Sequence, residues 1–312
     1  MREFTVLTHR RPQETTPALL RLAELAAEGG ARLRLDPRET QRHALQGGPG
    51  LQGGPGLELD APVKDDVELC IALGGDGTIL RALRLYRGTD VPVFAINFGE
   101  IGFLATVEPN ELEEGMRRVL ARDFELLHLP AIVLDGDALD SPATATARAA
   151  ASERAQDVEH PGLSGQAAVN DVAIHRKVGE RVAALAYEIE GEEVGSVRCD
   201  GLVVATPAGS TGYNLANGGP VMAWGVEGFV VSFIAPHSLT ARALVVAPGD
   251  RLTIHNRSVE PLEVALDGRP AGEIVAGGKI DARFVAEIGT IAQLPGSSFY
   301  RRLREKFGRL AS

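Results

Sequence analysis

The sequence lacks most of the residues from which a cross-linked or zinc-stapled protein is built. Of its 312 residues only two are cysteines, Cys70 and Cys199. Two thiols cannot form a disulfide framework, and they cannot supply a four-cysteine zinc site. Cys70 lies in an apolar stretch and Cys199 stands beside the acidic Asp200. The cysteine content therefore predicts a protein of the reducing cytoplasm.

Long apolar runs and an excess of basic residues are also missing. No stretch approaches the roughly 18 consecutive apolar residues of a transmembrane helix, and residues 1–5 lack the apolar region of a signal peptide. The formal net charge of −10 argues against nucleic acid or an acidic membrane surface as a partner. We therefore expect a soluble, cytoplasmic protein, in which any phosphate-bearing ligand is met by individual Arg and Lys residues.

Glycine is abundant, with 36 residues, and the overall composition is that of a globular protein. The length favours two domains of roughly 150 residues each. Strand, helix and strand patterns over 4–7, 17–27 and 31–35 favour a parallel sheet at the start, whereas short strand-like runs separated by Gly and Asp turns follow residue 124. We place an α/β domain over 1–122, a mostly antiparallel β domain over 123–296, and a C-terminal amphipathic helix over 297–312 that packs back on the body.

The chain is organised around an apolar strand pattern, residues 67–73, that ends in GGDGT at 74–78. A helical pattern follows over 79–86, with Thr78 as its expected N-cap. Ligands of open α/β sheets bind outside the carboxyl ends of the strands, where glycines present backbone N–H groups to anionic oxygens. A carboxylate among these amides, Asp76, suits a base for a hydroxyl or a metal ligand. The alternative is an ordinary Asp-Gly turn with no function.

The GGDGT pentamer resembles a motif shared by 6-phosphofructokinases, diacylglycerol and sphingosine kinases, and NAD kinases. The resemblance implies a Rossmann-like α/β domain of the kind that phosphofructokinases and diacylglycerol kinases have. It also implies phosphoryl transfer to a hydroxyl group, without identifying which molecule carries that hydroxyl.

Three polar stretches interrupt the strands predicted after residue 124. AVNDVAI at 168–174 places an amide beside a carboxylate, Asn170 and Asp171, inside an apolar run, where neighbours point to opposite faces of a strand. RCDG at 198–201 has an Asp-Gly pair, and TPAGSTGYNLANGGP at 206–220 offers amides, hydroxyls and an aromatic ring that suit a nucleotide base and its ribose. Structural alternatives exist for the first two stretches, namely a cross-strand hydrogen bond and a plain turn.

Taken in order, these stretches resemble the NAD kinase family. The matching motifs are GGDGT at 74–78, INFGEIGFL at 96–104, AVNDVAI at 168–174, DGLVVATPAGSTGYNLANGGP at 200–220 and APHSLTARALVV at 235–246, with FYRRLREKFG at 299–308 resembling the C-terminal end. The resemblance implies an ATP:NAD 2′-phosphotransferase that produces NADP. The alternatives are a GGDGT lipid or nucleoside kinase, which is not expected to carry the first and third polar stretches, and a non-catalytic NAD(P) sensor, which has no need of Asp76.

The resemblance also implies roles for single residues. Asp76 and Gly77 lie at the ribose that is phosphorylated, with Asp76 as proton acceptor, while Gly74 and Gly75 form the loop for the donor phosphates. The positions implied to bind NAD are Asn170 and Asp171, which hold a ribose, together with Arg81, Arg198, Asp200, Ala208, Thr211, Gly212, Tyr213, Asn214, Leu215 and Ala216. Arg269 joins this set at a place where many members of the family have Gln or His. His237 lies in a matched motif and is interpreted as structural.

The expected chemistry needs few protein groups. A hydrogen-bonded carboxylate acting as general base contributes about 10²–10⁴-fold, and phosphoryl transfer otherwise requires positioning and Mg²⁺ on the phosphates. Mg²⁺ needs no dedicated protein cage, so Asp76 can be the base or a metal ligand. ATP or polyphosphate can be the donor, and NAD or NADH the acceptor. Family resemblance and the frequency of symmetric enzymes predict a homo-oligomer, a dimer or tetramer.

Two segments stand outside these motifs. QGGPGL occurs twice in tandem, at 46–51 and 52–57, which is too short for a solenoid and predicts a loop expanded by duplication. That loop is either inert or a lid near the GGDGT strand. Residues 138–160 are rich in Ala, Ser and Glu without an apolar face, which predicts an exposed loop or a frayed helix.

Overall fold

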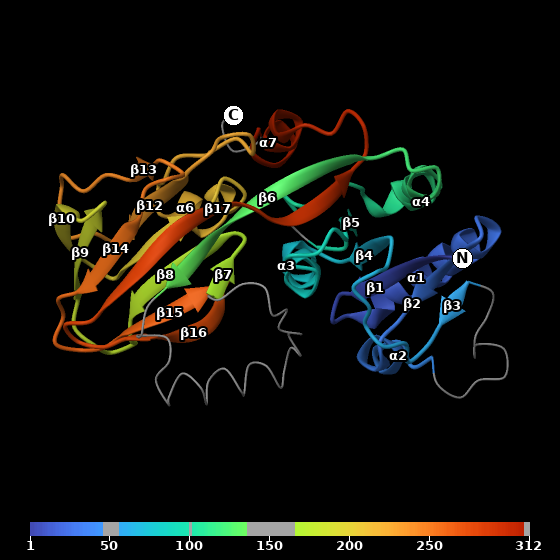
Figure 1. Cartoon of the computed structure of the whole chain (residues 1–312), viewed down its shortest axis with the longest axis horizontal. Helices are drawn as coiled ribbons and strands as arrows, with labels where there is room; N and C mark the ends of the chain where they lie inside the picture. Colours follow the sequence, from blue (N-terminus) through green and yellow to red (C-terminus); the bar gives the residue numbers. More distant parts are fainter. Residues whose placement is uncertain (46–55, 100–101, 136–165, 309–312) are drawn as a thin grey trace. The chain divides into compact units, whose positions relative to one another are not determined.

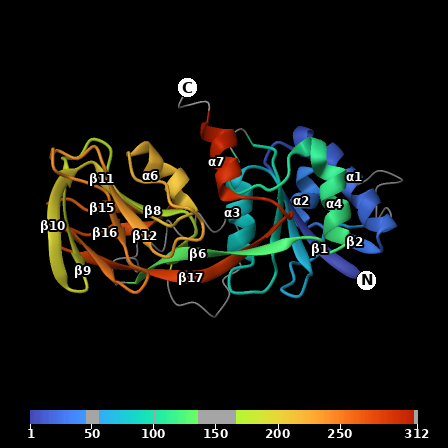
Figure 2. The ribbon, with the colours of Figure 1, turned by 90° about the horizontal axis from the view of Figure 1, so that it is seen from above.

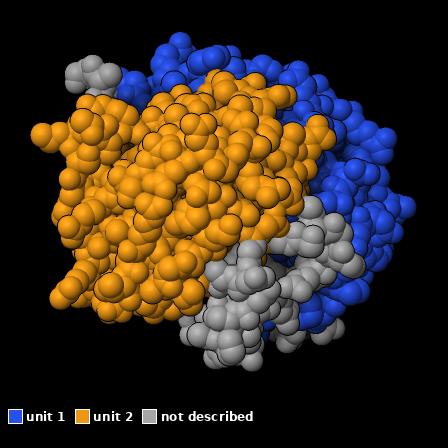
Figure 3. Space-filling model, turned by 60° about the vertical axis from the view of Figure 1, so that its left-hand side comes forward, with its two compact units in different colours: residues 1–128, 289–312 blue, residues 129–288 orange. Residues whose placement is uncertain are grey.

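The computed structural model describes residues 1–45, 56–99, 102–135 and 166–308, and Figure 1 labels its helices and strands. The chain divides into two compact units, residues 1–128 with 289–312 and residues 129–288, which are coloured separately in Figure 3. The tandem repeat lies almost wholly outside the described residues. Residues 138–160 and the last four residues of the C-terminal helix predicted over 297–312 also lie outside them. No described helix has the length and apolarity needed to cross a bilayer.

The first unit is built on a parallel sheet, which confirms the fold class predicted for the beginning of the chain. The strand order is β17-β5-β4-β1-β2-β3, and each of these neighbouring strands pairs in parallel with the next. β4 at the centre is buried at every position, as expected of a strand covered on both faces. The strands are β1 (Arg2–Thr8), β2 (Ala31–Arg34), β3 (Leu57–Glu58), β4 (Leu69–Leu73), β5 (Val93–Ile96) and β17 (Lys279–Gln293), whose Ile291 and Ala292 pair with β5.

Helices pack on this sheet through their apolar faces. They are α1 (Pro12–Glu28), α2 (Pro37–Arg42), α3 (Asp76–Leu85), α4 (Leu112–Leu120) and α7 (Phe299–Phe307), with a 3-10 turn, Pro109–Glu111, before α4. α1 and α4 lie side by side (Figure 2). α1 begins at Pro12 and not at the predicted Pro17, because a proline in the first helical turn has no N–H that would be left unpaired.

The start of α3 also differs from the prediction. The helix begins at Asp76 with Gly75 as its N-cap, so Thr78 lies inside the first turn and does not cap it. Thr78 is buried there against Gly74, where a Cβ on the glycine would come within 2.3 Å of the threonine Oγ1. The short GGDGT turn therefore leads directly from strand to helix, and it places the Asp76 carboxylate at a helix N-terminus, which favours negative charge.

The second unit contains two packed antiparallel sheets, which confirms the predicted β-rich part of the chain. One sheet has the order β13-β12-β11-β8-β15-β16, and the other contains β10-β9-β14-β17 together with β6 and β7. Apolar side chains of both sheets, such as Leu185 and Val231, share one core. The strands are β6 (Glu125–Asp135), β7 (Gln166–Ala168), β8 (Asp171–Arg176), β9 (Ala183–Ile189), β10 (Glu192–Cys199), β11 (Gly201–Ala205), β12 (Phe229–Ile234), β13 (Leu244–Val246), β14 (Leu252–Asn256), β15 (Leu262–Leu266) and β16 (Arg269–Ile274).

The predicted strand over 167–174 is broken. β7 ends at Ala168 and β8 begins at Asp171, so Val169 and Asn170 lie between two strands. The N–H groups at this break are bound by a side chain, as described below, and not by a neighbouring strand. The turn opposite the break comprises the 3-10 turn Gly209–Thr211 and the short helix α6 (Tyr213–Ala216).

Candidate active site

The Asp76 carboxylate is held by backbone amides of the segment that follows β5. The Phe103 N–H lies 3.1 Å from Oδ1 and 3.2 Å from Oδ2, and the Leu104 N–H donates to Oδ1 at 3.1 Å. The first turn of α3 and the segment 103–104 thereby fix the side chain in one orientation. A group so fixed can meet a reactant in a defined geometry.

Two opposing effects set the protonation of Asp76. Burial raises the pKa of its carboxyl, whereas the two backbone hydrogen bonds and the positive charges of Arg302 and Lys306 lower it. Burial is the larger effect, so the pKa lies above the usual range of an aspartate. A carboxylate with a raised pKa is a stronger base than a free one, which is the property that a general base requires.

Glycines allow the turns after β4 and β5 to touch. A Cβ on Gly99 would lie 2.7 Å from the Gly75 Cα, so neither turn could approach the other with side chains at these positions. Gly77 has open space around its missing Cβ and is exposed. The four predicted residues Gly74 to Gly77 thus form one continuous turn at the carboxyl end of the parallel sheet, where ligands of such sheets bind.

Arg81, one turn further along α3, is anchored to a buried acid. Its Nη2 donates to the Thr8 carbonyl at 3.0 Å and to Glu39 Oε1 at 2.7 Å. Glu39 is 1% exposed and also accepts from the Thr8 N–H and Oγ1. His43 contacts the same Thr8 hydroxyl at 2.8 Å, and burial lowers the pKa of that histidine. The guanidinium therefore has a fixed place beside the end of β1.

In the second unit, Asn170 and Asp171 carry unused hydrogen-bonding capacity. The Asn170 Oδ1 atom is buried without a hydrogen-bond partner. Asp171 is 8% exposed, and among the described residues nothing donates to its carboxylate. Burial first, and the charge of Asp267 second, raise the pKa of Asp171 to about 7. Because buried polar groups are normally satisfied, such a pair is the pattern expected of a site that a ligand completes.

Asp267 shapes the backbone at the break between β7 and β8. Its carboxylate accepts the N–H groups of Val169, Asn170 and Asp171 at 3.2, 2.7 and 3.3 Å. In return, the Asp267 N–H donates to the Asp171 carbonyl at 2.9 Å. Asp267 has a φ of +48°, which an Asp in an Asp-Gly turn tolerates. The Asp267 carboxylate thus accepts the backbone N–H groups that would bond to a neighbouring strand if the strand were continuous.

The turn after β11 is seated on the same break. Thr206 donates its N–H to the Asn170 carbonyl at 2.9 Å and its hydroxyl to the Val169 carbonyl at 2.6 Å. Gly209 is required here, since a Cβ would lie 2.0 Å from the Asn170 oxygen. Inside the turn, the Asn214 amide nitrogen donates to the carbonyls of Ser210 and Pro220, both at 3.0 Å. The predicted residues Ala208 to Ala216 are therefore brought against Asn170 and Asp171.

Tyr213 and Asp200 extend this group. Tyr213 stacks on His175 with ring centroids 5.6 Å apart. Burial, followed by the charges of Asp171 and Asp200, raises the pKa of the tyrosine. Asp200 is paired with Arg176 at 2.6 Å, and this hydrogen bond lowers the pKa of the aspartate. His175 and Arg176 were not predicted as site residues from the sequence. Their position as polar residues at the end of an apolar strand is the feature that could have identified them.

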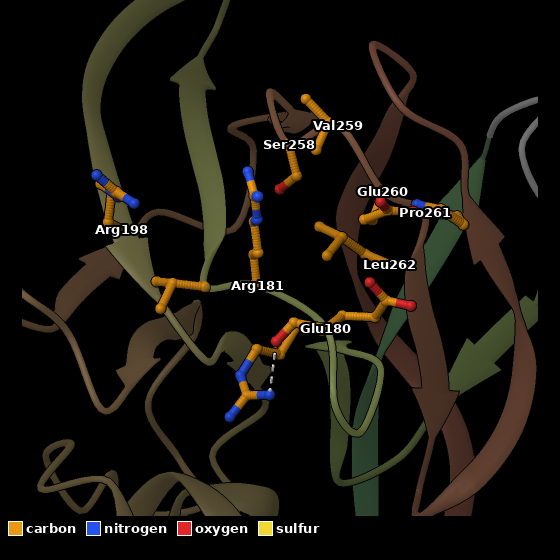
Figure 4. Close-up of a pocket in the computed structure, with 10 residues that line it drawn as sticks. Glu180, Arg181, Arg198, Ser258, Val259, Glu260, Pro261 and Leu262 are labelled. Carbon is orange, nitrogen blue, oxygen red and sulfur yellow. Dashed lines mark hydrogen bonds between the residues drawn. The ribbon is translucent and has the colours of Figure 1, made fainter.

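Arg198 and Arg269 lie at the margins of the second unit's site. Arg198 is exposed on β10 and lines a pocket of about 180 Å³ with Arg176 and Arg181. In Figure 4 the Arg181 side chain extends toward Ser258, while Arg198 stands on the neighbouring strand. Arg269 begins β16 and pairs with Leu266 across the Asp267-Gly268 turn. The three guanidinium groups of the pocket share it with the side chains of Glu180 and Glu260.

Within the described residues no group of three or more His, Cys, Asp or Glu side chains is placed to hold a metal ion. Both cysteines are free and buried. The predicted residues thus form two groups, each gathered within one unit: a fixed carboxylate on a glycine turn, and an amide-carboxylate pair beside a polar turn with a stacked tyrosine. The first can accept a proton, and the second can hold hydroxyl groups and a base.

Comparisons with known proteins agree with this chemistry. The model of the ATP-NAD kinase N-terminal domain matches residues 51–124, and that of the C-terminal domain matches residues 169–284. The NAD kinase of Gemmatimonas aurantiaca is 35% identical over 243 residues, which cover 78% of each chain. NAD kinase 2 of Streptomyces avermitilis is 31% identical over 292 residues, covering 93% of this chain and 90% of the relative.

Solved structures show the same fold. Yeast NADH kinase complexed with NADH has a TM-score of 0.81 at 21% identity, over all of this chain and 89% of its own. An NAD kinase from Archaeoglobus fulgidus in complex with ATP has a TM-score of 0.69 at 23% identity, over all of this chain and 99% of its own.

Proposed function

Because the chain belongs to the NAD kinase family, we propose that Asp76 is the general base of its reaction and that Asn170 and Asp171 hold the ribose of its substrate. Membership of the family gives the activity: a phosphoryl group passes from ATP to NAD, and NADP is the product. In this proposal, Asp76 takes the proton of the 2′-hydroxyl of the adenosine ribose as the oxygen attacks the terminal phosphorus of ATP. The bond from that phosphorus to the bridging oxygen breaks, and ADP leaves with the bonding electron pair.

One observation carries the assignment of the ribose site. The Asn170 Oδ1 atom and the Asp171 carboxylate are adjacent, buried, and without donors among the described residues. A ribose brings hydroxyl donors that would satisfy both. Tyr213, stacked on His175, offers a flat face beside them for the adenine ring. Leu215 and Ala216, which follow on α6, belong to the same proposed adenine segment.

The glycine turn suits the phosphate donor. α3 begins at the carboxyl end of β4, where the helix dipole favours an anion. We assign Gly74 and Gly75 to the loop that holds the donor phosphates. Arg81, which Glu39 holds in place, is assigned to binding the negatively charged phosphates of the dinucleotide. Arg198, Asp200 and Arg269 belong to the NAD-binding residues that we propose for the second unit.

The donor chemistry present fits Mg²⁺ without a dedicated cage. Mg²⁺ commonly uses one or two carboxylates together with substrate phosphates, and Asp76 is the carboxylate of the glycine turn that could take one coordination position. When bound, the ion neutralises charge on the phosphates that are transferred. The protein's own task is to orient the 2′-hydroxyl, accept its proton at Asp76 and keep the reacting groups aligned.

An assay with purified protein, NAD, ATP and MgCl₂ tests the proposal. We expect NADP phosphorylated at the 2′ position, identified by its phosphorus NMR signal, and loss of activity with EDTA that returns with excess Mg²⁺. Asp171→Ala should raise the KM for NAD about 10–100-fold, because removing hydrogen bonds to a charged group costs about 1.5–3 kcal/mol. An unchanged KM in a normally folded Asp171→Ala would remove the residue from the ribose site. NADH and polyphosphate, offered in place of NAD and ATP, determine the preferences for acceptor and donor.

A further inference from the structure

We propose that the C-terminal helix α7 is part of the active site, with Arg302 as the positioning residue that holds the backbone amide donors of the Asp76 carboxylate in place. This inference rests on the proposed role of Asp76. It assigns a function to a helix whose amphipathic pattern indicates only that it packs against the body.

Arg302 is connected to the Asp76 carboxylate through a single residue, Phe103, in the segment that follows β5. The Phe103 N–H donates to the Asp76 carboxylate at 3.1 Å, and the Phe103 carbonyl accepts a hydrogen bond from Arg302 Nη1 at 2.8 Å. Both ends of this residue's polar backbone are thereby engaged, one by the base and the other by the helix. A displacement of Arg302 would therefore move the donor that orients Asp76.

Aromatic packing fixes α7 over this segment. The Phe103 ring lies 5.6 Å from that of Phe299 in an edge-to-face arrangement, and 6.0 Å from that of Phe307. Ser298 caps the helix by accepting the Arg301 N–H at 3.1 Å. Contacts at both ends of the helix thus clamp Phe103, while Arg302, on the turn between them, reaches its carbonyl.

Arg302 also acts through its charge. Arg302 is only 8% exposed, and burial lowers the pKa of its guanidinium to about 10, well above neutrality. The group therefore remains charged at neutral pH, and its charge is among the influences that lower the pKa of Asp76. Other charged side chains among the described residues also act on the pair. Lys306 of α7 lowers the pKa of Asp76 and pairs with Glu108 at 3.7 Å, and Glu305 raises the pKa of Arg302.

Three single variants separate the charge from the packing. Arg302→Gln removes the charge but retains an amide donor, Arg302→Lys retains the charge, and Arg301→Gln is the matched control at the exposed neighbouring position. The measurement is kcat and the KM values for NAD and ATP at one pH, with thermal unfolding to verify folding.

We expect Arg302→Gln to lower kcat by about 5–10-fold, because the Phe103 N–H that orients the Asp76 carboxylate loses the support at its own carbonyl. The KM values for NAD and ATP should stay within about threefold. Arg302→Lys should retain most of the wild-type kcat, and Arg301→Gln all of it.

A double-mutant cycle separates failure of this inference from failure of the proposed function. If Arg302 acts through Asp76, adding Arg302→Gln to Asp76→Asn should lower turnover by less than twofold further, because the two changes remove one shared interaction. A kcat of Arg302→Gln equal to that of wild type, or an undiminished loss when the change is added to Asp76→Asn, overturns the role of Arg302 while leaving Asp76 as base. Near-wild-type turnover in Asp76→Asn alone overturns the proposed function itself.

Discussion

Replacing Asp171 by asparagine should stabilise the free protein while it weakens the binding of NAD. The carboxyl is 8% exposed, lies near Asp267, and receives no hydrogen bond from the described residues. Its pKa is raised to about 7 in the folded protein, against about 3.9 in an unfolded chain. Ionising it in the fold therefore costs on the order of 4 kcal/mol, at about 1.4 kcal/mol for each pKa unit.

The sign of this effect depends on pH. Between about pH 4 and pH 7 the folded protein holds a proton on Asp171 that the unfolded chain has lost, so the free energy of unfolding falls as the pH rises. The cost is absent below about pH 4 and fully present above about pH 7. Asp171→Asn removes it, and the apparent Tm should rise at pH 8.5 by about 5–10 °C, with a much smaller rise at pH 5.

The assay is differential scanning fluorimetry of the protein without nucleotide at pH 5 and pH 8.5. Asp200→Asn is the matched control, because Asp200 is paired with Arg176 and the pKa of Asp200 is lowered. That variant should lose stability by a similar amount at pH 5 and pH 8.5, because both values lie above the pKa of about 3.9 that an aspartate has in the unfolded chain. A gain for Asp171→Asn that is equal at both pH values, or a loss at pH 8.5, would refute the reasoning about its buried charge.

Three further predictions concern the scaffold. Gly209→Ala should lower stability by about 1–3 kcal/mol and raise the KM for NAD, since the added Cβ would lie 2.0 Å from the backbone oxygen of Asn170. The control is Gly225→Ala, because the space around its Cβ is open. Equal denaturation midpoints for the two variants would contradict the predicted clash. Glu39→Gln should destabilise by about 1–3 kcal/mol in urea and raise the KM for NAD, because Arg81 loses its buried negative partner and an NH₂ group replaces one of the two acceptor oxygens of Glu39. An unchanged KM would mean that the position of Arg81 does not affect NAD binding. Light scattering should give the mass of a dimer or a tetramer at micromolar concentration, and a fully active monomer would contradict this.

The sequence predicts the residues in both parts of the candidate site, but not the residues that hold them in place. GGDGT is a contiguous motif, so its strand, turn and helix could be predicted from local pattern, and Asp76 with them. The N-cap was misplaced because Thr78 has the right side chain for a cap, and only the packing against Gly74 shows that it lies inside the helix. Local propensity cannot show such contacts.

Long-range partners account for the rest. Asn170 and Asp171 were predicted, but the strand break beside them depends on Asp267, 96 to 98 residues later in the chain. An Asp-Gly pair indicates a turn and says nothing of which amides its carboxylate accepts. Arg302 lies 199 residues from the carbonyl that it binds, and within its own helix it is one basic residue among several. Neither residue carries a local signal of its role.

The central claim is that Asp76 takes the proton of the 2′-hydroxyl, and Asp76→Asn tests it most directly. The amide retains the size of the carboxylate but loses the basicity, so turnover should fall by about 10²–10⁴-fold. The Kd for NAD, measured by calorimetry, should remain within a few-fold of wild type, and the Tm should not fall. If the loss is instead recovered by added Mg²⁺ and affinity for ATP has fallen, Asp76 holds the metal. Near-wild-type turnover in Asp76→Asn would contradict the account.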